Sequence, residues 1–169
     1  MKLRCKKVNK KIIGVAAIIL FLDQITKLFA ESYLKLNKSV SVISHFFSLT
    51  LCHNEGVAWG LLANQPLLIA LGSIVAIVLI YHFIFCFKRN LRNDIAFGLL
   101  IGGMSGNLID RILLGYVRDF FDFIIFNYDY PVFNISDIAI VIGVLLLIYA
   151  VIKGEDVSEN NSSRKSKSK

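Results

Sequence analysis

Four long apolar blocks dominate the sequence and limit the folds that it can adopt. They run from Ile12 to Ala30, from Pro66 to Phe87, from Ile95 to Ile112 and from Asn134 to Ile152. A helix needs about 20 mostly apolar residues to cross the hydrocarbon core of a bilayer, and each block is close to that length. Within lipid, only helices and closed barrels satisfy all of their backbone hydrogen-bonding groups. The sequence therefore predicts an all-α membrane protein with four transmembrane helices.

The basic residues indicate how these helices are oriented. Six lie before the first block, three lie in the hinge at residues 88–92 and five lie from Lys153 onward, whereas five lie elsewhere in the chain. Loops rich in Lys and Arg remain on the cytoplasmic side of a membrane. We therefore expect both termini in the cytoplasm, with residues 31–65 and 113–133 outside. The net charge of +7 then reflects topology and contact with membrane lipid, so no nucleic-acid partner is expected.

The same blocks divide the chain into three parts. Residues 1–11 form a basic cytoplasmic N-terminus, residues 12–152 a four-span domain, and residues 153–169 a basic tail whose composition is typical of disorder. The basic start and the first apolar block would also suit a cleaved signal peptide. However, Asp23, Gln24 and Lys27 interrupt that block where a signal peptide is most uniform. We therefore favour a retained span.

The two outer segments show the pattern of strands. Phe47, Leu49 and Leu51 alternate with polar or small residues, which is the period of a half-buried strand. Val117 and the Phe120–Phe121 pair in the second outer segment also favour strands. We expect a small extracytoplasmic β-rich segment at the outer membrane surface.

The third block contains Gly98, Gly102 and Gly106 at four-residue spacing. Small residues on one helix face allow close packing between membrane helices. We expect this face to contact a neighbouring helix and to make the third span a rigid support for polar residues at its outer end.

Polar side chains inside or beside the apolar blocks are the best candidates for chemistry, because an ionisable group at membrane depth is costly unless it is paired. They gather near the predicted outer ends of the spans: Asp23, Lys27, Asn107, Asp110, Arg111, Asn134 and Asp137, with Asp119 in the outer segment. Two carboxylates close together do not both ionise easily, so such a pair can supply one acid and one base. Several pairs are possible at this stage. The three cysteines lie far apart without metal-site spacing, and no metal is expected.

Five motifs occur in order along this layout: Asp23-Gln24-Ile25-Thr26-Lys27, Asn54-Glu55-Gly56-Val57-Ala58-Trp59-Gly60, Gly106-Asn107-Leu108-Ile109-Asp110-Arg111, Gly115-Tyr116-Val117-Arg118-Asp119-Phe120 and Phe133-Asn134-Ile135-Ser136-Asp137. The set closely resembles the lipoprotein signal peptidases, the bacterial type II signal peptidases, from about Ile12 to Ile152. Val57 and Ser136 depart mildly from the residues common in that family. The basic tail lies outside the resemblance.

The resemblance implies an intramembrane aspartyl endopeptidase, a hydrolase that removes the signal peptide from diacylglyceryl-modified prolipoproteins just before the lipidated cysteine. The positions that match its catalytic pair are Asp119 and Asp137. The matching supporting or substrate-orienting positions are Asp23, Lys27, Asn54, Gly56, Asn107, Asp110, Arg111 and Asn134. It implies no metal or organic cofactor. We expect a monomer in the bacterial cytoplasmic membrane, with the active site near the extracytoplasmic face.

Several roles have a simpler alternative. Asp110 and Arg111 could form structural ion pairs, Asp23 could cap a helix end, and Asn54 and Asn134 could stabilise turns or caps rather than orient carboxylates or substrate. Trp59 is expected to anchor the chain at the membrane interface. Asp94, Asp122 and Asp129 match no motif and are expected to be solvated charges.

Two other functions are compatible with buried carboxylates. A proton-coupled transporter keeps carboxylates in its spans, but transporters usually contain internal repeats and sites near the bilayer midplane. A non-catalytic membrane assembly factor is the other alternative. In the favoured hypothesis the signal helix enters from the side, and the segment at residues 40–62 covers the scissile bond. Asp119 and Asp137 activate water, and the sequence leaves open which of them is the base.

Overall fold

Four long helices make up most of the fold in the computed structural model, which describes residues 7–56 and 65–156. They are α1 (Lys10–Tyr33), α2 (Pro66–Phe83), α3 (Leu91–Leu114) and α4 (Ile135–Ile152), and a short 3-10 turn, η2 (Ile84–Cys86), extends α2. All four are long and apolar enough to cross a membrane, as predicted. The expectations for Val57, Trp59 and most of the basic tail concern positions outside the described residues.

Polar caps explain where the helices begin and end. The side chain of Asn9 accepts a hydrogen bond from the backbone of Lys11 at the start of α1, and Asn90 does the same for Asn93 at the start of α3. Such side chains satisfy backbone N–H groups that have no partner within the helix. Gly115 ends α3 with a φ of 85°, a conformation that glycine adopts without strain. Because the cap precedes a polar first turn, α3 begins at Leu91, earlier than its apolar block predicts.

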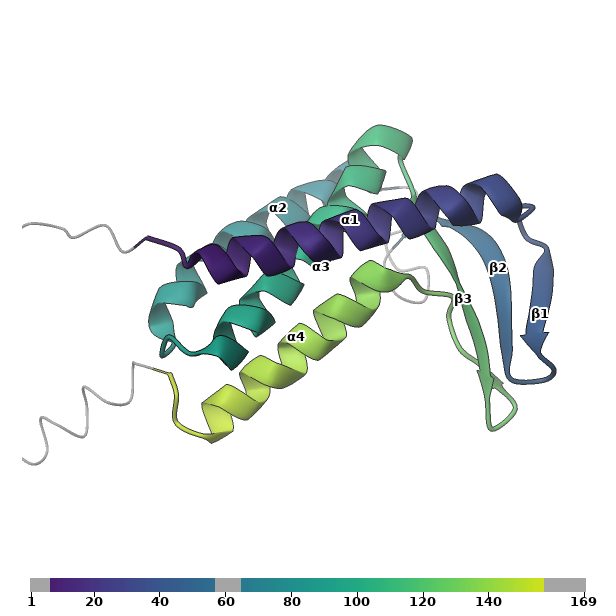
Figure 1. Cartoon of the computed structure of the whole chain (residues 1–169). Helices are drawn as coiled ribbons and strands as arrows, with labels where there is room; N and C mark the ends of the chain where they lie inside the picture. Colours follow the sequence, from purple (N-terminus) through teal and green to yellow (C-terminus); the bar gives the residue numbers. More distant parts are fainter. Residues whose placement is uncertain (1–6, 57–64, 157–169) are drawn as a thin grey trace, which may run out of the picture.

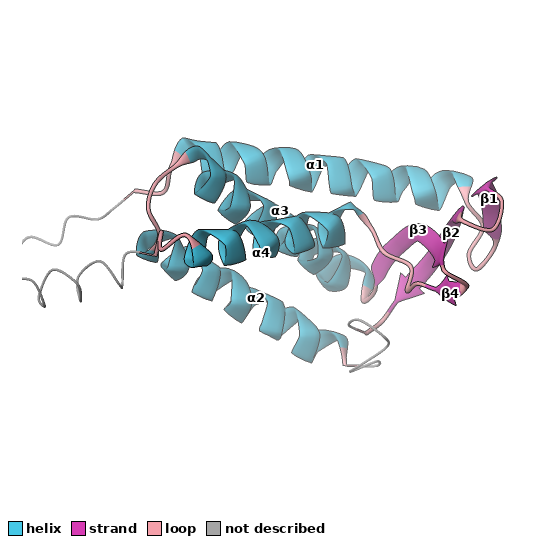
Figure 2. Ribbon diagram, turned by 90° about the horizontal axis from the view of Figure 1, so that it is seen from below, coloured by secondary structure: helices cyan, strands magenta, loops and turns pink. Residues whose placement is uncertain are grey.

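α3 is the centre of the bundle and packs closely against α1 and α4. A methyl group on Gly102 would lie 2.7 Å from the carbonyl oxygen of Ala16 in α1, and one on Gly103 would lie 2.6 Å from that of Ser136 in α4. Glycine is therefore required at these contacts. The predicted glycine face is confirmed, because Gly98, Gly102 and Gly106 all lie against residues of α1. α2 packs mainly on α3, and it diverges from α4 toward the end that carries the sheet (Figure 2).

A four-stranded antiparallel sheet lies at the end of the bundle opposite the start of α1 and the end of α4 (Figure 1). Its strands are β1 (Ser39–Ile43), β2 (Phe47–Asn54), β3 (Val117–Ile125) and β4 (Tyr128–Asp129), in that order. The predicted strands correspond to β2 and β3, which pair from Phe47 opposite Phe123 to Asn54 opposite Val117. The sheet packs on the helices through a cluster of apolar side chains: Ala30, Leu34, Leu49, Leu51, Phe120, Phe121 and Ile135.

Two of the three carboxylates expected to be solvated are engaged instead. Asp94 is only 5% exposed and accepts a hydrogen bond of 2.6 Å from the side chain of Asn9. It lies in the first turn of α3, where a negative charge is favourable. Asp122 accepts a hydrogen bond from the hydroxyl of Thr50 on the neighbouring strand. Only Asp129 lies exposed, in β4.

Candidate active site

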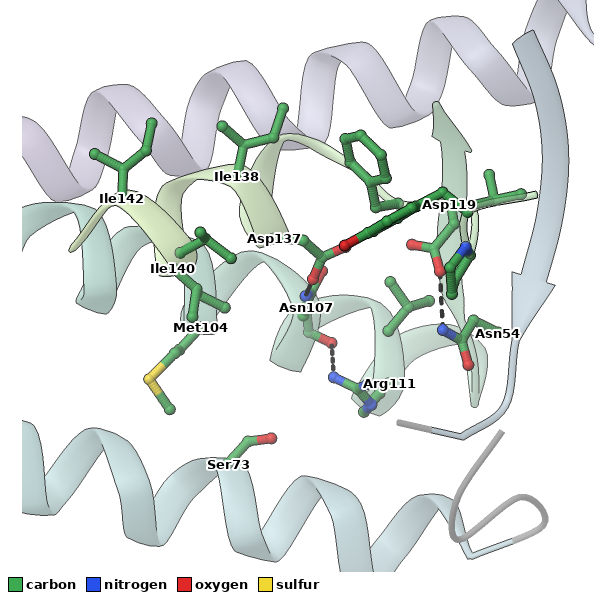
Figure 3. Close-up of a pocket in the computed structure, with 16 residues that line it drawn as sticks. Asn54, Ser73, Met104, Asn107, Arg111, Asp119, Asp137, Ile138, Ile140 and Ile142 are labelled. Carbon is green, nitrogen blue, oxygen red and sulfur yellow. Dashed lines mark hydrogen bonds between the residues drawn. The ribbon is translucent and has the colours of Figure 1, made fainter. Parts of the chain in front are cut away.

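Asp119 and Asp137 come from different elements but line the same cavity. Asp119 lies near the start of β3, and Asp137 lies in the first turn of α4. The cavity has a volume of about 680 Å³, and residues of α2, α3, α4 and the segment at 130–133 line it (Figure 3). Most of its lining is apolar, including Met104, Ile138 and Val141. The two carboxylates are therefore presented to a largely apolar space.

Asn134 connects the two carboxylates. Its side-chain amide donates a hydrogen bond of 2.6 Å to Oδ1 of Asp119, and its backbone N–H donates one of 3.1 Å to Oδ2 of Asp137. Its side-chain oxygen accepts from the backbone N–H of Asp137 at 3.0 Å, which completes a capping box at the start of α4. The same residue thus caps a helix and orients both carboxylates, so the two alternatives considered for it are compatible.

Two further amides bind the remaining carboxylate oxygens. Asn54 donates a hydrogen bond of 2.9 Å to Oδ2 of Asp119, and Asn107 donates one of 2.8 Å to Oδ1 of Asp137. Asn54 also accepts from the backbone N–H of Gly56. Each carboxylate therefore has a partner on both oxygens, and these partners restrict how either side chain can rotate.

Asp119 is only 2% exposed, and this burial dominates its titration. Loss of hydration and the negative charge of Asp137 together raise the pKa of Asp119 from 3.8 to about 7, although hydrogen bonds from Asn54 and Asn134 oppose the shift. Burial disfavours the charged form of a carboxyl group, and a second carboxylate adds to the effect. Asp119 therefore retains a proton close to neutral pH.

Lys27 is completely buried and reaches the carboxylate pair through Asn107, which binds Asp137. Its ammonium group is 2.8 Å from Asp23 and 3.4 Å from Asp110, and it donates a hydrogen bond of 2.9 Å to Asn107. Asp23 also accepts a hydrogen bond of 3.0 Å from the backbone N–H of Ser136. The carboxylate of α1 thus satisfies a free N–H at the start of α4, which combines the two roles considered for it.

Arg118 is the main participant that the sequence did not reveal. It is 5% exposed, and its guanidinium group contacts both oxygens of Asp110 at 2.7 and 3.2 Å. Its backbone N–H donates to the same carboxylate, and its side chain reaches Glu31 and Gln24. Asp23 and Asp110 are two buried carboxylates beside a single buried lysine, so they require a second cation, and Arg118 lies within the quoted motif next to Asp119. That imbalance of charge was the available signal.

Arg111 does not pair with its neighbour Asp110. Its guanidinium group donates instead to the carbonyl oxygens of Gly56 at 3.1 Å and Asn107 at 3.5 Å, and it lines the cavity. Arg111 thereby links the end of β2 to α3. The ten positions named from the sequence are all connected in one network, while their roles in a reaction remain predictions.

The fold and the site together define a class: a helical protein with four membrane-spanning-length helices and paired carboxylates facing an apolar cavity. The signal peptidase (SPase) II family matches residues 15–153. Lipoprotein signal peptidases of Staphylococcus aureus, in strains JH9 and Newman, are 41% identical over 140 residues, which are 82% of this chain and 86% of theirs. The chain belongs to the signal peptidase II family.

Two solved structures support this assignment. Both are described as bacterial membrane enzymes determined by the in meso method, at 2.3 and 1.9 Å resolution. The first has a TM-score of 0.79 and 37% identity, and the match covers 88% of this chain and 91% of that one. The second has a TM-score of 0.77 and 36% identity, with coverages of 90% and 99%. The likeness therefore extends over nearly the whole fold.

Proposed function

We propose that this protein is an aspartyl endopeptidase of the membrane that removes the signal peptide from diacylglyceryl-modified prolipoproteins, cutting before the lipidated cysteine. The observation that carries the proposal is the pair of carboxylates, Asp119 and Asp137, at one apolar cavity. Burial keeps a proton on Asp119 near neutral pH. Family membership supports the same reaction, because the Staphylococcus aureus relatives are lipoprotein signal peptidases.

In the proposed mechanism the two carboxyl groups share one proton. The ionised carboxylate accepts a proton from a water molecule, whose oxygen attacks the carbonyl carbon of the scissile amide. The neutral carboxyl group donates a hydrogen bond to the carbonyl oxygen. When the tetrahedral intermediate breaks down, the carboxyl group that took the proton from water gives it to the amide nitrogen. The C–N bond breaks, the amine of the lipidated cysteine leaves, and the new carboxyl group remains on the signal peptide. Asn134 supports this chemistry because it contacts both carboxylates.

The cavity suits an apolar substrate. Met104, Val141 and Ile142 line the part between α3 and α4, and Ser73 contributes from α2. Because α2 diverges from α4 on this side (Figure 2), we propose that the signal helix enters between them from the lipid. The acyl chains of the modified cysteine would then remain in the bilayer while the scissile bond reaches Asp119 and Asp137.

The proposed orientation follows from charge. The described basic residues at the end away from the sheet include Lys7, Lys10, Lys88 and Lys153, and loops of this kind face the cytoplasm. The sheet and the carboxylates then lie at the extracytoplasmic face of a bacterial plasma membrane. We propose that the protein acts as a monomer, since all the proposed catalytic groups come from one chain.

A cleavage assay with matched precursors tests this function. The purified protein in detergent is given one prolipoprotein precursor in two forms, with and without the diacylglyceryl group, and the products are measured by mass spectrometry. We expect cleavage of the lipidated form immediately before its cysteine, and little or no cleavage of the other form. Intact lipidated precursor in the presence of correctly folded protein would contradict the proposal and would favour the transporter or assembly-factor alternatives.

A further inference from the structure

The sheet has two chemically different faces. Residues that pair directly across antiparallel strands lie on the same face. Val40 pairs with Leu49, and Leu49 with Phe121, whereas Ser41 pairs with Ser48, and Ser48 with Asp122. One face is therefore apolar, and the other carries hydroxyl groups and a carboxylate.

The apolar face is the one that meets the helices. Leu49 and Phe121 pack with Ala30 and Leu34 at the end of α1 and with Ile135 at the start of α4. However, the helices cover only part of this face, because the sheet runs across their ends and its two hairpin turns extend past α4 (Figure 1). The uncovered part still exposes apolar side chains: Val40 by 52% and Ile125 by 39%.

The turn between β3 and β4 makes this extension more apolar. Phe126 is 100% exposed, and it has a φ of 51°, followed by Asn127 with a φ of 61°. This left-handed conformation favours glycine or asparagine and is costly for a bulky residue. A fully exposed phenylalanine in a strained turn is not explained by packing within the chain. Its side chain is available to an environment outside the protein.

We propose that the overhanging part of the apolar face, with Phe126 at its tip, rests in the bilayer leaflet beside α4 and anchors the sheet there. The position of this surface supports lipid as its occupant. The apolar face continues from the ends of α1 and α4, whose outward side chains, such as Phe29 and Leu145, are themselves exposed and apolar. The polar face, with Thr50 bonded to Ser39 and Asp122, then points to water. Aromatic and aliphatic side chains insert at this depth in interfacial amphipathic segments.

The proposed anchoring involves neither Asp119 nor Asp137. It also explains why asparagine, the residue that tolerates the turn best, does not occupy position 126. Insertion of the phenylalanine ring compensates for the backbone strain, because burial of a large apolar side chain contributes more than the strain costs.

Fluorescence quenching tests the proposal on the full chain. Trp59 is the only tryptophan of the chain, so Phe126→Trp and the matched control Ser41→Trp are made in a Trp59→Phe background. Both proteins are reconstituted in phosphatidylcholine–phosphatidylglycerol vesicles with or without bromine on the acyl chains. Because interfacial side chains reach several ångströms into the leaflet, we expect quenching of the Phe126→Trp protein to be at least about twofold stronger.

Equal quenching of the two proteins, or stronger quenching of the Ser41→Trp protein, would overturn the proposal. If Phe126→Trp does not fold, Val40→Trp, which lies opposite Leu49 on the apolar face, replaces it with the same expectation. Since the measurement needs no substrate, its failure would leave the proposed peptidase function untouched, and failure of the cleavage assay would leave this proposal untouched.

Discussion

Asp119 combines deep burial with hydrogen bonds to both carboxylate oxygens, and its titration should govern how activity depends on pH. Burial and the charge of Asp137 raise the pKa of Asp119 to about 7. Above that pH the pair loses its shared proton, and we expect kcat/KM to fall about tenfold for each further pH unit. Initial rates of precursor cleavage between pH 5 and 9 measure this profile. A profile that stays flat up to pH 9 would contradict the assignment of the proton to this pair.

The same pKa shift makes a prediction for stability. The folded protein binds the proton of Asp119 more tightly than the unfolded chain does, since the pKa is raised from 3.8. Its contribution to stability is therefore fully present below pH 3.8 and is lost as the pH rises through about 7. Asp119→Asn cannot ionise and should remove this part of the pH dependence. Thermal unfolding in detergent across this range compares the variant with the wild type, and parallel curves would contradict the prediction.

Arg118 should be needed for both stability and the position of Asp119. Arg118→Gln removes the guanidinium group that binds both oxygens of Asp110, and breaking a buried ion pair costs about 3 kcal/mol or more. Arg118→Lys retains the charge but cannot bind both oxygens at once, so we expect an intermediate loss of unfolding free energy. Chemical denaturation of the three proteins measures the difference, and the pH profile of cleavage shows whether Asp119 has shifted. Wild-type stability in Arg118→Gln would show that this contact is unimportant.

At the residue scale, the sequence predicted which side chains gather but not how they bind one another. Ionisable groups near the ends of the apolar blocks could be placed at one level because the blocks fix their depth. Sequence spacing did not show that Asp23 of α1 would accept a hydrogen bond from Ser136 of α4, because this contact depends on how the helices cross. Arg118 was missed because it lies in a strand whose burial follows only from the packing of the sheet on the bundle.

At the scale of the helix, the glycines of α3 set the distance to its neighbours. Gly102→Ala would place a methyl group 2.7 Å from the carbonyl oxygen of Ala16 and 2.9 Å from Cβ of Ile19. Since backbone must move to make room, we expect a loss of about 1–3 kcal/mol in unfolding free energy. Gly14→Ala in α1 is the matched control, because no atom lies within 4 Å of the added carbon. Equal stability of the two variants would contradict close packing between α1 and α3.

The elements themselves were largely predictable, for physical reasons. Apolar blocks long enough to span a bilayer have few alternatives to helix, and all four appear as such. The ends of the helices were less predictable, since α1 reaches Tyr33 and α3 starts at Leu91. The caps and the end turns of a helix contain polar residues, so an apolar block is shorter than the helix that it predicts. β1 was not predicted, although Ser39, Val40, Ser41 and Val42 alternate between polar and apolar residues as β2 does.

At the scale of the whole molecule, the two ends of the bundle have different tasks. At the end away from the sheet, the carboxylate of Glu155 accepts hydrogen bonds from Asn90 at 2.8 Å and Asn93 at 3.1 Å, and it pairs with Arg92. These contacts lower the pKa of Glu155 to about 2 and join the end of α4 to the start of α3. The opposite end holds the carboxylates and the cavity. The contacts that close the bundle and the proposed catalytic groups thus lie at opposite ends of its length.

This separation predicts that Glu155→Gln lowers the midpoint of thermal unfolding without changing kcat/KM. The charge is lost at the closing contacts, while Asp119 and Asp137 keep all their partners. Because the pKa of Glu155 is lowered in the folded state, the stabilisation is present above its ordinary value of 4.5 and is lost as the pH falls toward about 2. Asp129→Asn, at an exposed site, is the control. A loss of activity at an unchanged unfolding temperature would contradict the separation.

Topology predicted the meeting of four carboxylates at one end of the molecule, yet it did not predict the overhang of the sheet. The carboxylates follow from the direction in which each span runs. The overhang depends on the register of β2 against β3 and on the angle at which the sheet leaves the bundle, and neither is encoded in a local pattern.

The central claim is that Asp119 and Asp137 together cleave the precursor. Its most direct test is the rate of cleavage of the diacylglyceryl-modified precursor by wild type, Asp119→Asn and Asp137→Asn, with Asp122→Asn as a control on the same strand as Asp119. We predict that each of the first two variants loses activity by at least about 10²–10⁴-fold while remaining folded, and that Asp122→Asn cleaves at nearly the wild-type rate. Cleavage within a few-fold of wild type by either Asp119→Asn or Asp137→Asn would contradict the account.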